Sequence, residues 1–257
     1  MVAMQSEFSG KTALVTGASR GIGAATAVAL AEAGCGRLLL HYAASVHSAE
    51  ETARQVRARG AEAELLGGDL STEAGIRGFV ELLGSRARFV DILINNAGSL
   101  IRRARLAEMD YELFNRVMDL NAKSVWFITQ AVAPHMVERG SGVIVNVSSI
   151  AARTGGGIGA TVYAAAKAAV SAFTKGMARE LAPHGVRVNA VSPGTVDNDF
   201  HARFSTREML EAVVRQTPQG RLSTNEDIAG VIVFLCSHAA RNVIGQTIEV
   251  NGGMYMV

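Results

Sequence analysis

Tyr163 and Lys167 are the residues of this sequence whose types and spacing point most directly to chemistry. They stand four residues apart in a segment expected to be helical, so both side chains lie on one face, one turn apart. A tyrosine hydroxyl has a pKa near ~10 in water, and an ammonium within roughly 4–6 Å favours the ionised form and lowers that pKa. The pair therefore predicts an acid/base group that works near neutral pH. Taken alone, the pair favours a packed tyrosine beside a solvated lysine, and it is the rest of the chain that favours the catalytic interpretation.

The run 16–23, which contains Gly17, Gly21 and Gly23, is suited to binding a diphosphate. It follows a predicted strand and opens an alanine-rich helix, where backbone N–H groups can reach phosphate oxygens if no side chain blocks the approach. Gly17 permits the tight turn, Gly21 the close approach, and Gly23 the packing of helix on strand. Ordinary turns also use glycine, but the strand–loop–helix context favours phosphate binding.

The residues after the second predicted strand favour NADP over NAD. NAD sites usually place a carboxylate there to hold the ribose 2′-hydroxyl, but no Asp or Glu occurs between Glu32 and Glu50. Arg20, in the glycine loop, can bind a 2′-phosphate instead, and a solvated loop arginine is the alternative. We therefore predict NADP(H) as the preferred cofactor and NAD as the weaker one. The other residues expected to complete this pocket are Ser45 and either Tyr42 or His41.

Two later strand ends supply further candidate contacts to the cofactor. Asp69 and Leu70 follow the third predicted strand, where Asp69 can either hold the adenine amino group or cap the next helix. The residues Asn96, Ala97 and Gly98 follow the fourth predicted strand, where small and amide residues suit backbone contact with the adenosine half. A simple turn is the alternative for this second group.

Composition and length exclude several classes of protein. The chain has 257 residues, 49% of them hydrophobic and 19% charged, which is enough to bury a large α/β core. Its net charge of +2 is too small to indicate a nucleic-acid partner. Cys35 and Cys236 have no metal-ligand spacing, so we predict no metal site and read both as core residues. No signal-peptide pattern and no apolar run near the ~18 residues of a membrane span occurs, so a cytoplasmic location without a membrane partner is expected.

Short apolar runs alternate with longer helix-like segments, which predicts an α/β, doubly wound Rossmann fold. The runs are apolar throughout, as expected for a parallel sheet covered by helices on both faces. About seven strands are predicted, over residues 12–16, 37–41, 63–66, 91–95, 142–147, 187–191 and 247–250. Helices are predicted near 21–34, 46–59, 73–87, 110–138, 161–182 and 226–236. Asp110 is the expected N-cap of the long segment 110–138, which is expected to bend near Asp119.

Nothing in the sequence divides the chain into parts. We find no repeat, low-complexity tract or linker, so one Rossmann-type domain over residues 1–257 is predicted. The segment at about 195–222 interrupts the alternation of strands and helices, is polar and contains arginines. We interpret it as an insertion that forms a substrate lid over the strand ends.

In this order, the run 16–23, the run 95–98, Ser149, the Tyr163/Lys167 pair and Pro193-Gly194 resemble the motifs of the short-chain dehydrogenase/reductase family. The resemblance extends from about Phe8 to Gly253 and includes the family's last strand and turn. The chain is similar to the compact, single-domain branch, which contains beta-ketoacyl carrier-protein reductases, glucose dehydrogenases and other sugar or polyol dehydrogenases.

The resemblance implies a role for each of four residues. Tyr163 exchanges a proton with the substrate oxygen, and Lys167 lowers the pKa of that tyrosine and holds the nicotinamide ribose. Ser149 hydrogen-bonds the substrate oxygen, and Asn121 holds a water that links Lys167 to solvent. Ser148 is the alternative serine, because the gap from Ser149 to Tyr163 is one residue longer than in many members. The full set of predicted cofactor contacts is Gly17, Ser19, Arg20, Gly21, Ile22, Gly23, Tyr42, Ser45, Asp69, Leu70, Asn96, Ala97, Gly98, Tyr163, Lys167, Pro193, Gly194 and Thr195.

The predicted reaction is NADP(H)-dependent interconversion of a carbonyl and a secondary alcohol. Enoyl reductases of this superfamily separate the tyrosine and lysine by six residues rather than three, which argues against that reaction. The loops expected to line the pocket contain several arginines that could receive an anionic substrate, but we expect most of them to be surface charges. These residues are Arg102, Arg103, Arg105, Arg153, Arg203 and Arg207, together with His201.

The expected substrate is a small polar sugar, polyol or hydroxy/keto acid. A 3-oxoacyl-[acyl-carrier-protein] reductase is the alternative, and a non-catalytic cofactor-binding sensor or scaffold is the remote one. Glu138 and His184 stand where the carrier-protein reductases usually have basic residues for docking, although Arg139 and Arg187 are close by. Carrier-protein docking is therefore possible but not favoured.

The segments 110–138 and 161–182 are apolar on more than one side, so they need a cover beyond their own sheet. Family members usually pair these helices across a two-fold axis. We therefore predict self-association to a homotetramer, with a dimer as the second expectation.

Overall fold

The computed structural model describes residues 7–257 of the chain. At its centre is a seven-stranded sheet with the order β3-β2-β1-β4-β5-β6-β7, in which every neighbouring pair is parallel. The strands are β1 (Thr12–Val15), β2 (Arg37–Tyr42), β3 (Glu62–Gly67), β4 (Ile92–Asn95), β5 (Gly142–Val147), β6 (Val186–Pro193) and β7 (Thr247–Val250). The predicted doubly wound fold class is confirmed.

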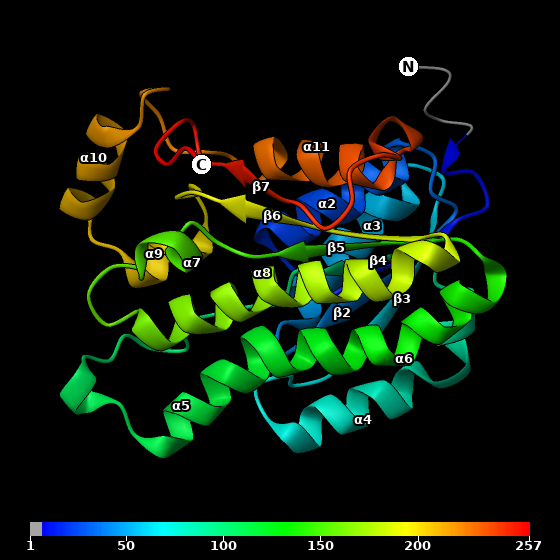
Figure 1. The fold of residues 1–257 in the computed structure, drawn as a ribbon, viewed down its shortest axis with the longest axis horizontal. Helices are drawn as coiled ribbons and strands as arrows, with labels where there is room; N and C mark the ends of the chain where they lie inside the picture. The colour runs from blue at the N-terminus through cyan, green and yellow to red at the C-terminus, as the bar shows by residue number, and fades with distance from the viewer. Residues whose placement is uncertain (1–6) are drawn as a thin grey trace.

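Helices cover both faces of the sheet (Figure 1). One layer consists of α2 (Gly21–Glu32), α3 (Val46–Arg57) and α11 (Asn225–Cys236), and the other of α4 (Glu73–Leu83), α5 (Tyr111–Met118), α6 (Ser124–Arg139) and α8 (Thr161–Leu181). The shorter helices α7 (Ala151–Thr154), α9 (Asp199–Phe204) and α10 (Arg207–Gln216) lie beyond the strand ends. Within residues 7–257, no helix has the length and apolarity that crossing a bilayer requires.

The strands bury both of their faces because successive side chains alternate between the two helix layers. Ala13 and Val15 belong to the core cluster that includes residues of α2 and α11. Leu14, between them, belongs to the opposite cluster, with Phe79 of α4 and Val132 of α6. All three strand residues are fully buried, which explains why the strands read as continuous apolar runs.

The long segment predicted as one helix over 110–138 is divided in the structure. Asp110 caps α5 by accepting the Leu113 N–H at 2.7 Å, as predicted. A π-helical turn, η3 (Asp119–Lys123), then separates α5 from α6, at the place where a bend was expected. Such turns shift the side chains of a helix out of register and are frequent at functional sites. Asn121 lies inside this turn.

Arg187, on β6, stabilises the carboxyl end of α11. Its guanidinium donates hydrogen bonds to the carbonyls of Leu235, Cys236, Ser237 and Ala240, at 2.8 to 3.2 Å. The last carbonyls of a helix have no partner within it, so a buried helix end needs such a donor.

We expect Arg187→Met to lower the free energy of unfolding by about 2–4 kcal/mol, because it leaves buried carbonyls without donors. Urea denaturation measures this change. Arg241→Met is the control, since Arg241 is exposed and close in sequence, and it should change stability by less than about 0.5 kcal/mol. Equal effects of the two substitutions would contradict the capping role.

Candidate active site

The candidate site lies at the carboxyl ends of β1 and β4, where the order of the sheet reverses. Ligands of doubly wound sheets bind in the crevice at this point. Two predicted loops meet here, because the Asn96 amide N–H donates to Thr16 Oγ1 at 2.9 Å and Asn96 Nδ2 donates to the Gly17 carbonyl at 3.2 Å. These hydrogen bonds join the glycine loop 16–23 to the loop 95–98, the two loops of the predicted cofactor site.

The glycine loop leaves room for a diphosphate. Gly17 has a φ of +66°, which side chains rarely adopt, and a Cβ there would lie 3.0 Å from Ala97 Cα. A Cβ at Gly23 would collide with the Gly17 carbonyl oxygen. Arg20, the N-cap of α2, makes no side-chain hydrogen bond to the first turn within the described chain, which leaves those N–H groups for a ligand. Ser19 and Ile22 are half-buried in the same loop. The loop thus fits the pyrophosphate of a dinucleotide.

Tyr163 and Lys167 lie on one face of α8, as their spacing predicts. Lys167 Nζ is 5.8 Å from the centre of the Tyr163 ring and donates to the Val147 carbonyl at 2.8 Å. Lys167 is only 2% exposed, whereas Tyr163 keeps part of its surface accessible. A nearly buried ammonium therefore stands beside a phenol that a substrate can reach.

The predicted lowering of the Tyr163 pKa is wrong for this structure. Burial raises the pKa of Tyr163 to about 12, and a side-chain hydrogen bond with Ser149 opposes that rise. Burial also lowers the pKa of Lys167 to about 8. Removal from water penalises both charged forms, and for Tyr163 this effect outweighs the hydrogen bond with Ser149. Tyr163 therefore carries its proton at neutral pH.

The structure separates the two candidate serines. Ser149 is the serine whose side chain acts on Tyr163 and opposes the rise of the tyrosine pKa, and its Oγ accepts the Ala151 N–H at 3.1 Å. Ser148 is buried, and its Oγ donates to the Lys167 carbonyl at 2.9 Å and contacts Ser171 Oγ at 2.8 Å. Successive residues point to opposite sides at the end of a strand, so only Ser149 faces the tyrosine hydroxyl.

Asn121 is held beside Lys167 by the π-helical turn. Its Oδ1 accepts the Ser99 N–H at 3.1 Å, and its Nδ2 donates to the carbonyls of Ser99 and Val117, each at 2.8 Å. A Cβ at Gly98 would lie 2.7 Å from Asn121 Oδ1 and 2.9 Å from Lys167 Nζ. Gly98 thus keeps open the space between this amide and this ammonium. Sequence analysis did not identify Ser99, and no spacing pattern marked it.

We expect Gly98→Ala to lower kcat by about 10²-fold, because the added methyl group displaces Asn121 or Lys167. The variant should remain folded, since Gly98 is exposed. Steady-state kinetics and circular dichroism check both points. Gly78→Ala is the matched control, because a Cβ there meets nothing within 4 Å among the described atoms, and its kcat should match the wild type.

The residues predicted to contact the adenosine half lie at the ends of β2 and β3. Ser45 Oγ donates to Ser48 Oγ at 2.7 Å, and the half-buried Tyr42 packs its ring near Gly67. Asp69 is exposed and accepts the Ser71 N–H at 2.9 Å, next to the buried Leu70. Burial raises the pKa of Asp69, but hydrogen bonds from Ser71 outweigh it and the net pKa lies below the ordinary value.

The structure corrects two expectations about the residues that contact the adenosine half of the cofactor. Asp69 does not cap the next helix, because Thr72 caps α4 through a 3.1 Å hydrogen bond from the Gly75 N–H. His41 does not line the pocket, since it is only 2% exposed and lies beneath the glycine loop. The sequence of β2 did not indicate that the His41 side chain is buried or which way it points, because this strand is apolar on both faces.

The end of β6 is held against β5 and β7. The Pro193 carbonyl accepts the Ile150 N–H at 2.9 Å, and the Gly194 N–H donates to the Val250 carbonyl at 3.0 Å. Thr195 follows, and its carbonyl accepts the Ser223 N–H at 3.1 Å. These contacts fix the start of the segment 195–222, which contains α9 and α10.

Helix α9 lies over both the glycine loop and the tyrosine. Arg20 of the loop forms a 3.5 Å ion pair with Asp199, and both side chains are largely exposed. The Phe200 ring is 5.9 Å from the Tyr163 ring, centre to centre. Sequence analysis missed Phe200, because nothing in the irregular segment indicated which of its side chains faces the site.

The arginines of the predicted pocket loops are mostly engaged with protein groups. Arg102, Arg153 and Arg207 pair with acidic side chains. Arg103 and Arg203 donate to backbone carbonyls. This agrees with the expectation that most of them are not substrate-binding groups.

The two basic residues considered for carrier-protein docking are also engaged. Arg187 caps α11, and Arg139 donates to the carbonyls of Arg88 and Val90. His184 lies in the short turn η4 (Ala182–His184) between α8 and β6.

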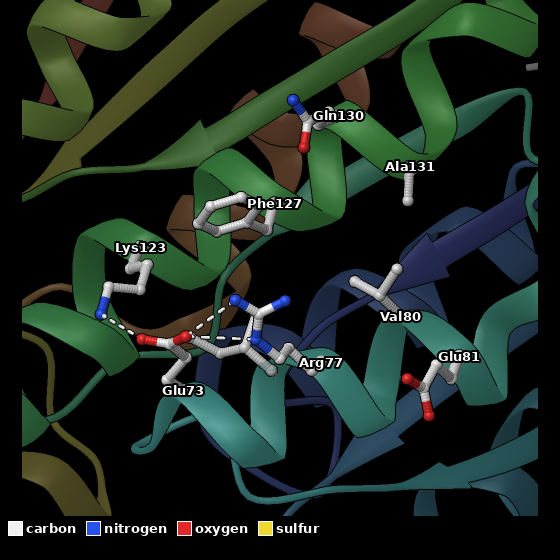
Figure 2. Close-up of a pocket in the computed structure, with 9 residues that line it drawn as sticks. Glu73, Arg77, Val80, Glu81, Lys123, Phe127, Gln130 and Ala131 are labelled. Atoms are coloured by element: carbon white, nitrogen blue, oxygen red, sulfur yellow. Dashed lines mark hydrogen bonds and ion pairs between the residues drawn. The ribbon is translucent and has the colours of Figure 1, made fainter.

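A groove of about 480 Å³ lies elsewhere, between α4 and α6 (Figure 2). Phe127 and Val80 supply apolar surface, while Glu73 pairs with Arg77 and Lys123 at the rim. None of the predicted catalytic residues lines this groove.

Comparison with known proteins gives consistent matches over the whole fold. A family model described as Enoyl-(Acyl carrier protein) reductase matches residues 17–255. The 3-oxoacyl-[acyl-carrier-protein] reductase FabG of Staphylococcus aureus is 38% identical over 246 residues, which cover 96% of this chain and 98% of that protein.

Two solved structures agree with these matches. A short-chain dehydrogenase/reductase from Serratia marcescens is 33% identical with a TM-score of 0.86, and the match covers 96% of this chain and 99% of that chain. A putative NAD(P) dependent gluconate 5-dehydrogenase from Beutenbergia cavernae, with bound NADP, is 35% identical with a TM-score of 0.88. That match covers 97% of this chain and 98% of the other.

Proposed function

The chain belongs to the short-chain dehydrogenase/reductase family and is an oxidoreductase, and from this premise we propose that it interconverts a carbonyl and a secondary alcohol with NADP(H). Tyr163 is the general acid/base. The observation that carries the proposal is the meeting of Ser149, Tyr163 and Lys167 at the carboxyl end of β5, beside the glycine loop crevice. The spacing of Tyr163 and Lys167 argues against the enoyl reduction named in the description of the family model.

Each side chain has a defined task in the reducing direction. Tyr163 holds a proton at its hydroxyl and donates it to the carbonyl oxygen, which Ser149 also hydrogen-bonds. The Lys167 ammonium stabilises the negative charge that develops on the phenol oxygen, and burial strengthens this attraction. A bound nicotinamide cofactor supplies the hydride. Lys167 would hold its ribose, the loop 17–23 its diphosphate, and residues 96–98 its adenosine half.

Arg20 is the residue proposed to select NADP(H). Its ion pair with Asp199 is long and exposed and therefore weak, so the guanidinium can turn to a 2′-phosphate. We expect Arg20→Ala to lower kcat/KM for NADPH by about tenfold or more, and to leave kcat/KM for NADH within about twofold. Steady-state kinetics with both cofactors measure this. Asp199→Ala, which frees Arg20, should not lower the NADPH value. Comparable efficiency of the wild type with NADH and NADPH would contradict the preference.

Two substrate classes follow from different observations. The engaged arginines, together with Glu138 and His184 at positions that are usually basic, favour a small sugar, polyol or hydroxy/keto acid over a carrier protein. The structural similarity to the gluconate 5-dehydrogenase supports the same class. The second candidate is a 3-oxoacyl-[acyl-carrier-protein] reductase, which the 38% identity to the Staphylococcus aureus enzyme favours.

A kinetic screen with NADPH and NADH against ketones, sugars, sugar acids and acyl thioesters tests the proposal. Turnover of polar hydroxy or keto compounds at the highest kcat/KM supports the first class, and turnover of 3-oxoacyl thioesters supports the second. Cofactor binding without turnover of any compound would favour a sensor or scaffold instead.

We also propose that the chain forms a homotetramer, with a dimer as the second possibility. Tyr111 and Phe114 of α5 and Trp126 and Phe127 of α6 are exposed, with exposed fractions from 40% to 91%. Aromatic residues gathered on neighbouring helices are typical of protein interfaces. A monomeric mass in sedimentation would contradict this.

Three further expectations stay predictions: the single domain over 1–257, the lid at about 195–222 and the cytoplasmic location.

A further inference from the structure

His41 makes two hydrogen bonds that join three segments of the candidate site. Its Nδ1 accepts the Gly17 N–H at 3.0 Å, and its Nε2 lies 2.9 Å from the Gly68 carbonyl oxygen. The His41 carbonyl also accepts the Ala18 N–H at 2.8 Å. His41 thus links the glycine loop after β1 to the ends of β2 and β3, three strands that are neighbours in the sheet.

The two partners determine the protonation of the imidazole. The Gly17 amide is a donor, so Nδ1 must be unprotonated, and the Gly68 carbonyl is an acceptor, so Nε2 must carry the proton. Burial lowers the pKa of His41 to about 4, against the opposing effects of the Gly68 carbonyl and Asp69. The neutral ring therefore persists at neutral pH.

Packing fixes the orientation of the ring. The imidazole meets the Phe79 ring edge to face, with centroids 4.6 Å apart and an angle of 74°. His41 and Phe79 are 2% and 1% exposed. A ring held in this way cannot turn away from Gly17 without opening the core, so its hydrogen bond constrains the loop.

We propose that His41 is a positioning residue for the cofactor: it clamps the phosphate-binding turn at Gly17, so that the N–H groups at the start of α2 are already in place when the diphosphate binds. This rests on the proposed function, because it presumes that the glycine loop binds a dinucleotide. Asn96 holds the Gly17 carbonyl from the other side, so the turn is fixed at both its N–H and its C=O.

The test compares His41→Phe, which keeps an aromatic ring but removes both hydrogen bonds, with Phe79→Leu, which keeps both hydrogen bonds but alters the packing. Calorimetry with NADPH measures the Kd of each variant. We expect the Kd of His41→Phe to rise about tenfold, with the KM for cofactor rising in parallel and kcat at saturation within about twofold of the wild type. Phe79→Leu should lose stability and raise the Kd by clearly less than His41→Phe does, because both hydrogen bonds of His41 remain. His41→Gln, which can still accept from Gly17, should fall between the wild type and His41→Phe.

An unchanged Kd in folded His41→Phe, or an equal rise in Phe79→Leu, would overturn the proposal. If His41→Phe does not fold, ¹⁵N NMR of the wild-type histidines decides, since one nitrogen of His41 must be protonated and the other not. A His41 ring that titrates like a free imidazole would also overturn it. Failure of the wild type to bind any dinucleotide would instead refute the proposed function, while the NMR result would stand.

Discussion

A Tyr163→Phe variant should lose about 10³-fold in kcat and still bind the cofactor as the wild type does. The substitution removes only the hydroxyl that exchanges the proton, and the ring keeps its place against Phe200. Single-turnover kinetics and calorimetric titration with NADPH measure the two quantities separately.

Two serine variants serve as matched controls for this experiment. Ser149→Ala removes a partner of the Tyr163 hydroxyl and should lower kcat by about 10²-fold. Ser148→Ala removes contacts to the Lys167 carbonyl and Ser171 and should leave kcat within about threefold. Wild-type turnover in Tyr163→Phe, or the reverse order of the two serines, would refute the assignment.

Substitution of Lys167 by methionine should separate stability from activity. Lys167 is a buried ammonium whose hydrogen-bond partner in the structure is the Val147 carbonyl, and burial lowers its pKa to about 8. Methionine fills a similar volume without a charge to desolvate. We therefore expect Lys167→Met to raise the free energy of unfolding of the cofactor-free protein by roughly 1–3 kcal/mol at pH 7, while kcat falls at least about 10²-fold.

The difference in free energy of unfolding between Lys167→Met and the wild type depends on pH, and the pKa values of Lys167 set the sign of that dependence. In the unfolded chain the pKa of Lys167 has its ordinary value of 10.5, and burial lowers it to about 8 in the folded chain. Between these two values the unfolded state binds more protons, so the stability of the wild type rises with pH there. The advantage of Lys167→Met should be full below pH 8 and should shrink as the pH rises from about 8 toward 10.5. Denaturation at several pH values checks this, and a gap that widens in that range would contradict it.

Lys167 should also appear in the pH profile of carbonyl reduction. Its positive charge is lost as the pH rises through about 8, so the wild-type kcat should decline above that pH. The residual activity of Lys167→Met should lack this decline. A profile that is the same in both proteins would assign the alkaline limb to another group.

Most of the fold was predictable because its determinants are local. The strand predicted over 142–147 coincides with β5, and the one predicted over 63–66 lies within β3. Continuous apolar runs between helical patterns leave few arrangements other than a doubly wound parallel sheet. The bend near Asp119 was also expected, but the π-helical turn that produces it was not, because its hydrogen bonds depend on what surrounds the helix.

The candidate site was predictable to the extent that backbone geometry alone sets it. Four residues along a helix bring Tyr163 and Lys167 to one face in any surroundings. Glycine at 17 and 23 has a steric reason that holds wherever a strand turns tightly into a helix. The spacing could not tell Ser148 from Ser149, because both follow the same strand.

By itself, then, the sequence determined which residues could do the chemistry and on which elements they stand. Only the tertiary structure decided that Ser149 rather than Ser148 meets the tyrosine, that His41 supports the glycine loop from below, and that burial raises the pKa of Tyr163. The physical reason is that burial, charge and hydrogen bonding at each group depend on neighbours distant in sequence. Gly17 and His41, 24 residues apart, acquire their roles only when β1 and β2 lie side by side.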